Sequence, residues 1–132
     1  ATAAINAQGM AAWARATMGH RLGRDCPPEF VEGWIKLMSS TALSTEQGFR
    51  RGGQGIDVVP DLPDVKCPTL VVTTEGSRVG STVADMRAWQ ERISHSELLV
   101  LPTDSYHVSV THPELCAKAT LDFIDRAAAT VS

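Results

Sequence analysis

The chain has 132 residues, with 12 Lys and Arg against 15 Asp and Glu, a net charge of -3 and 5% aromatic residues. This mildly acidic balance excludes nucleic-acid binding as the main function. The apolar runs are too short to span a bilayer and no signal peptide is visible, so we expect a cytoplasmic chain with no membrane partner. The 3 Cys and 4 His lack the spacing of a disulfide framework or a metal site, and we expect neither.

The N-terminal part of the chain has the pattern of helices. Residues 5–20 are rich in Ala, with small and apolar side chains at helical spacing, and Gly23 is suited to end this helix. Asp25 and Pro28 can begin a second helix, and residues 44–51 a third. The apolar face of the second helix comprises Phe30, Val31, Trp34, Ile35 and Met38.

The middle of the chain predicts a strand followed by a helix. Residues 57–63 contain two prolines, which favour extended backbone in the residues before them. The apolar run within residues 65–74 is rich in β-branched residues and lacks alternation, as expected of a strand buried on both faces. A polar stretch, residues 75–81, then leads to an amphipathic helix. One face of that helix carries Val83, Met86, Trp89 and Ile93.

The most informative stretch follows this helix. Residues 98–101 predict a second apolar strand, after which a short polar loop presents His107 and a last helix opens within residues 111–114. Parallel sheets bind ligands outside the carboxyl ends of their strands, and an imidazole titrates near neutral pH. His107 is therefore a candidate active-site base.

The order of these motifs resembles the C-terminal part of the α/β-hydrolase family. The similarity covers a "PTLVV" strand, a polar loop, a helix, an "ELLVLP" strand, the His loop and a final helix, over roughly residues 58–127. It implies an α/β fold in which residues 58–132 form parallel strands with flanking helices, and residues 1–57 form a helical cap. It also implies that His107 is the general base of a catalytic triad, acting on a small-molecule substrate without a cofactor.

One departure from the family concerns the nucleophile. The G-x-S-x-G elbow is absent from the chain, which begins with Ala1 rather than Met. Two parallel strands are also too few for a sheet that stands alone. We therefore expect a processed or clipped C-terminal fragment whose partner is the N-terminal fragment of the same precursor, carrying the nucleophile.

A second departure concerns the triad acid. Where the family commonly has an Asp, the aligned residue is Ser77, whose neutral hydroxyl cannot stabilise an imidazolium as a carboxylate does. Either Glu75 supplies the acid, or the acid lies in the N-terminal part. We favour the second, because the side chain of Glu75 should point to the other side of the loop from Ser77. For Asp104, near His107 in sequence, we expect a local turn.

The resemblance implies hydrolysis of an ester, lactone or similar carbonyl compound. Candidate substrate-contacting residues are Trp34, Met38 and Val108, although packing of the cap against the core explains Trp34 and Met38 better. Two alternatives stay open. One is a cofactor-independent C–C hydrolase or dioxygenase on the same fold, and the other is a non-catalytic interaction protein.

Overall fold

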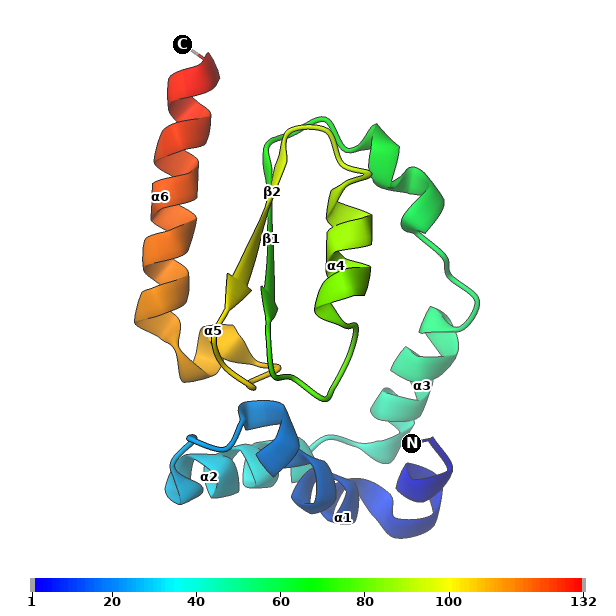
Figure 1. Ribbon diagram of the computed structural model, residues 1–132. Helices are drawn as coiled ribbons and strands as arrows, with labels where there is room; N and C mark the ends of the chain where they lie inside the picture. Colours follow the sequence, from blue (N-terminus) through cyan, green and yellow to red (C-terminus); the bar gives the residue numbers. More distant parts are fainter. Residues whose placement is uncertain (1, 132) are drawn as a thin grey trace.

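The computed structural model describes the backbone of residues 2–131 and the side chains of residues 9–129. In chain order it contains α1 (Thr2–Leu22), α2 (Pro28–Ser39), α3 (Leu43–Gly53), a 3₁₀ helix η1 (Val59–Asp64), β1 (Thr69–Thr74), α4 (Val83–Gln90), β2 (Ser96–Leu101), α5 (Val108–Thr111) and α6 (Pro113–Val131). Helices α1 to α3, which we call the helical segment, lie across the carboxyl ends of the strands, and α4 and α6 flank the strands on opposite sides (Figure 1). Among the described helices, none combines the length and the apolar character needed to cross a bilayer.

The two strands pair in parallel, from Thr69 opposite Ser96 to Thr74 opposite Leu101. The predicted order of strand, helix, strand and helix is confirmed, with α4 packed on both strands. The strand side chains are mostly half-buried, and the buried ones are Thr74 and Leu101 at the carboxyl ends. The full burial expected for both faces is not reached within the described residues, because the strand pair has no third strand beside it.

The buried core of the helical segment lies between α1 and α2. It comprises Ala14, Met18, Leu22 and Ile35. Trp34 and Met38 are partly buried and pack against this cluster. We expected both residues to pack the helical segment against the core. Trp34 does contact the core, through the ring of His107, whereas the packing reported for Met38 is within the helical segment.

The N-terminal helices differ from the sequence prediction at two points. Helix α1 is interrupted at Gly9, where φ is 77° and ψ is 174°, because glycine reaches positive φ without the penalty that a Cβ brings. Gly23 ends the helix as predicted, with φ at 89° and its N–H bonded to the carbonyl of Gly19. The residue before α2 is Pro27, and no side chain caps that helix, so Asp25 does not have the capping role expected of it.

The connection into β1 was predicted to be extended and is instead the 3₁₀ helix Val59–Asp64. A side-chain oxygen of Asp57 accepts a hydrogen bond of 3.0 Å from the N–H of the first residue of this helix. Pro60 and Pro63 fit because their fixed φ, near -65°, also suits a 3₁₀ helix.

Candidate functional site

The loop that carries His107 lies at the carboxyl end of β2. His107 is the residue before α5, and the backbone N–H groups of Tyr106 and His107 both donate to the carbonyl of Arg21, at 2.9 and 3.1 Å. Arg21 belongs to the last turn of α1, where carbonyls have no partner inside the helix. The end of α1 therefore holds the backbone of the candidate base.

The imidazole of His107 is half-buried between two aromatic rings. It stacks on Trp34, with ring centroids 6.1 Å apart and 14° between planes, and it meets Tyr106 edge-on at 5.0 Å. Among the described residues, no carboxylate forms an ion pair with it. Desolvation, and then the positive charge of Arg21, lower the pKa of His107 below its usual value. Both effects favour the neutral ring, the protonation state that a general base needs.

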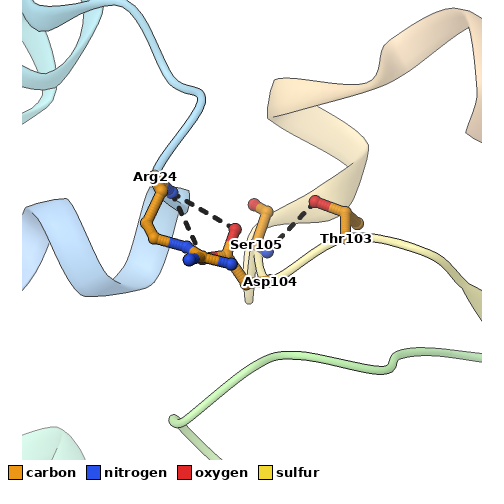
Figure 2. A network of polar contacts seen from close by, with 4 residues as sticks. All are labelled: Arg24, Thr103, Asp104 and Ser105. Carbon is orange, nitrogen blue, oxygen red and sulfur yellow. Dashed lines mark hydrogen bonds and ion pairs between the residues drawn. The ribbon is translucent and has the colours of Figure 1, made fainter.

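Asp104 ties the same loop to the turn between α1 and α2. Its carboxylate accepts hydrogen bonds from the backbone N–H of Arg24, at 3.2 and 3.3 Å, and from Nε of Arg24 at 3.0 Å (Figure 2). Desolvation raises the pKa of Asp104, but the hydrogen bonds and charge of Arg24 outweigh it and lower this pKa overall. The local turn expected of Asp104 was therefore wrong, because the carboxylate has a partner far away in sequence.

Buried polar contacts hold the loop from inside. Ser105 is fully buried, and its N–H donates to Oγ1 of Thr103 at 3.3 Å (Figure 2). The hydroxyl of Thr111, from α5, donates to Oγ of Ser105 at 2.8 Å. These bonds satisfy polar groups that would otherwise lose their hydration on burial, so they favour one loop conformation.

Two glycines permit the close approach of this loop to its neighbours. A Cβ on Gly23 would lie 2.6 Å from Oδ1 of Asp104, and a Cβ on Gly76 would lie 2.9 Å from Cβ of Asp104. Gly76 also donates its N–H to the carbonyl of Thr103 at 3.1 Å. The loop is thus confined between the end of α1 and the turn after β1.

We expect Gly76→Ala to lower the free energy of unfolding by about 1–3 kcal/mol, because the added methyl group must displace the backbone at Asp104. Gly33→Ala is the matched control. Gly33 is exposed within α2 with open space around it, so the same change should be neutral or stabilise by up to about 1 kcal/mol. Urea denaturation of both variants checks this, and a Gly76→Ala variant as stable as the parent contradicts the close packing.

The sequence analysis also singled out Glu75, Ser77 and Val108 near the site. Glu75 is exposed directly after β1, and no ion pair joins it to His107. Oγ of Ser77 donates to the carbonyl of Val79 at 3.0 Å and accepts from the N–H of that residue at 3.2 Å, which closes a local turn. Val108 lines a cavity of about 230 Å³ together with Ser77. The identity of the acid stays a prediction.

Arg21 and Tyr106 were missed by sequence reasoning. Arg21 lies near a helix end, where basic residues are common because they complement the helix dipole, so its sequence position carried no functional signal. Tyr106 is adjacent to His107, but its edge-on contact with the imidazole depends on the loop conformation. The side chains of both residues line a larger cavity beside the loop.

Comparison with known proteins supports the fold. No family model matches the sequence. The chain is 31% identical over 97 residues to the 2-(acetamidomethylene)succinate hydrolase of Mesorhizobium japonicum, an alignment that covers 72% of this chain and 33% of that protein. The chain thus spans about a third of the length of this curated relative.

Solved structures show the same arrangement of elements. The enol-lactonase from Burkholderia xenovorans LB400 superposes with a TM-score of 0.81 at 19% identity, over 94% of this chain and 48% of that one. A thermophilic esterase from Thermogutta terrifontis gives 0.80 at 21% identity, over 96% and 47%. With the parallel strand pair, its flanking helices and the His107 loop, these similarities show that the chain has the C-terminal part of the α/β-hydrolase fold, which confirms the fold predicted from the sequence.

Proposed function

We propose that the chain is the C-terminal part of a hydrolase that cleaves an ester, lactone or similar carbonyl compound, with His107 as its general base. The observation that carries this proposal is the environment of His107. The imidazole lies at the carboxyl end of β2, stacked on Trp34, without a carboxylate partner in the described residues and with a lowered pKa. A neutral ring in that position can accept a proton from a nucleophile.

In this mechanism a serine of the N-terminal part attacks the carbonyl carbon, and its hydroxyl proton passes to His107. The imidazolium then gives that proton to the leaving group, and an acyl-enzyme remains. Water attacks the acyl-enzyme, again losing its proton to the imidazole, and releases the acid product while the serine recovers its proton. Each bond formed is matched by one broken, and the histidine ends in its starting state.

The proposal also bears on the position of the triad acid. Desolvation and Arg21 both disfavour the charged form of His107, so the imidazolium formed during the reaction needs a carboxylate to stabilise it. Since Glu75 makes no ion pair with the ring, we propose that this carboxylate belongs to the N-terminal part. The names of the relatives, a hydrolase, an enol-lactonase and an esterase, support carbonyl hydrolysis without fixing one substrate.

The test uses the complete enzyme, meaning this chain together with the proposed N-terminal part. Acid release from 4-nitrophenyl butyrate and from γ-butyrolactone is followed in a pH-stat while dissolved oxygen is recorded. We expect acid release without oxygen consumption. Because the active form of His107 is the neutral one, activity should fall as the pH drops through the pKa of His107 in the complete enzyme.

Two results would contradict this function. Oxygen consumption coupled to turnover indicates the dioxygenase alternative. Absence of turnover on any ester, lactone or C–C substrate, in a complete and folded protein, indicates the non-catalytic interaction protein.

A further inference from the structure

A cavity of about 730 Å³ lies beside the loop of His107. Its lining residues come from α1, α3, the segment after β1 and the loop after β2. Its walls include Trp13, Arg21, Phe49, Arg50, Arg78 and Tyr106. Two of these residues adjoin the candidate base: Tyr106 contacts the ring of His107, and the carbonyl of Arg21 accepts the N–H of His107. A molecule in this cavity would therefore lie close to the reacting centre.

Arg21 has no ion-paired partner among the described residues, and Glu46 of the same cavity attracts its charge only at a distance. Its guanidinium lies 5.2 Å from the ring centroid of Trp13, yet it forms no hydrogen bond or ion pair with a described residue, and its Nη1 is buried and unpaired. A half-buried guanidinium loses hydration, and cation–π contact with Trp13 compensates only part of that loss. The arrangement leaves room for an anion as the missing partner.

The rest of the cavity carries an excess of positive charge. Arg50 also lies over Trp13, at 5.7 Å, but it is paired with Glu46 through an Nη2–Oε1 contact of 2.6 Å. Arg78 forms no ion pair within the part of the chain described here. One acidic side chain, three arginines and His20 thus line the cavity, and two of the arginines, Arg21 and Arg78, form no ion pair with a described residue.

We propose that this cavity binds a carboxylate group of the substrate, with Arg21 as its principal ligand. A planar carboxylate matches the fork of a guanidinium through two parallel N–H···O bonds. The aromatic walls formed by Trp13, Phe49 and Tyr106 suit the carbon chain of an organic acid better than inorganic phosphate. The assignment of the ligand as a substrate rests on the proposed function, which it deepens: the hydrolase would act on a carbonyl compound that also carries a carboxylate.

Binding of succinate to the complete protein, followed by isothermal titration calorimetry, tests the site without catalysis. Arg21→Gln should weaken succinate binding on the order of 10- to 100-fold, the usual cost of losing a charged hydrogen-bond partner. Arg21→Lys should fall between, because it keeps the charge but loses the fork. Arg15→Gln is the matched control, since Arg15 is an exposed arginine on the same helix, paired with Glu32, and should leave the affinity unchanged.

The outcome that overturns the carboxylate site is an equal succinate affinity in Arg21→Gln and the parent. Phosphate binding as tightly as succinate, with the same dependence on Arg21, also overturns it. If Arg21→Gln fails to fold, judged by circular dichroism, the comparison of Arg21→Lys with the parent decides, and an unchanged affinity in that variant contradicts the inference.

Kinetics separate this inference from the proposed function. The ratio of kcat/KM for 4-nitrophenyl hydrogen succinate to that for neutral 4-nitrophenyl butyrate should fall on the order of 10- to 100-fold in Arg21→Gln and stay constant in Arg15→Gln. Hydrolysis of both esters with an unchanged ratio contradicts the carboxylate site alone. Succinate binding that depends on Arg21, without hydrolysis of either ester, contradicts the proposed function alone.

Discussion

Expressed alone, this chain should aggregate or remain partly molten. Its accessible surface is 8727 Å², whereas a folded monomer of 14.2 kDa exposes about 6,800 Å², so about 1,900 Å² more than usual is left uncovered. The excess includes large apolar side chains on α6, namely Leu115, Leu121 and Ile124. Gel filtration with light scattering, and thermal melting followed by near-ultraviolet circular dichroism, measure this.

Co-expression with the proposed N-terminal part should reverse that behaviour. The described sheet has two strands and therefore two outer edges without a strand partner, which are available to a neighbouring strand. We expect a stable assembly with an interface well above the ~1,600 Å² of an ordinary protein complex, because it must complete a sheet and cover its faces. A monodisperse monomer of the isolated chain that unfolds cooperatively contradicts the need for a partner.

In the complete enzyme, His107→Ala should lower kcat by about 10³- to 10⁶-fold, the range observed when a triad member is removed. The backbone N–H that bonds to Arg21 is kept, and the loss of the contact with Trp34 should cost about 1 kcal/mol of stability. Steady-state kinetics together with denaturant unfolding separate the chemical effect from the structural one.

His95→Asn is the control for this variant. His95 is exposed beside the opposite end of β2, and Asn tolerates its φ of 60°. The control should keep parental turnover. Near-normal turnover in His107→Ala would instead remove His107 from the chemistry and favour the non-catalytic interpretation of the fold.

The parts of the fold that could be predicted depend on local pattern. The apolar runs that became β1 and β2 are marked by their β-branched residues, and the amphipathic period predicted α4. The position of His107 followed from a general property of parallel sheets, in which strand ends carry ligand-binding loops. These features could be predicted because each depends only on residues that are close together in the sequence.

The remaining features depend on residues that meet only in the folded chain. Arg24 and Asp104 are 80 residues apart in sequence, and nothing local to either indicates their ion pair. The same holds for Trp34 stacking on His107 and for the carbonyl of Arg21 that holds the loop. The break at Gly9 could not be predicted either. Glycine adopts helical and positive-φ backbone about equally readily, so the presence of a glycine does not show which of the two forms.

Labelling of the complete enzyme with a fluorophosphonate tests directly whether His107 activates a serine nucleophile. The labelled residue is identified by mass spectrometry. We expect one modified serine outside this chain, and labelling slowed by orders of magnitude in His107→Ala but not in His95→Asn, because the neutral imidazole activates the nucleophile. No labelling, or labelling at the same rate in His107→Ala as in the parent, would contradict this activation.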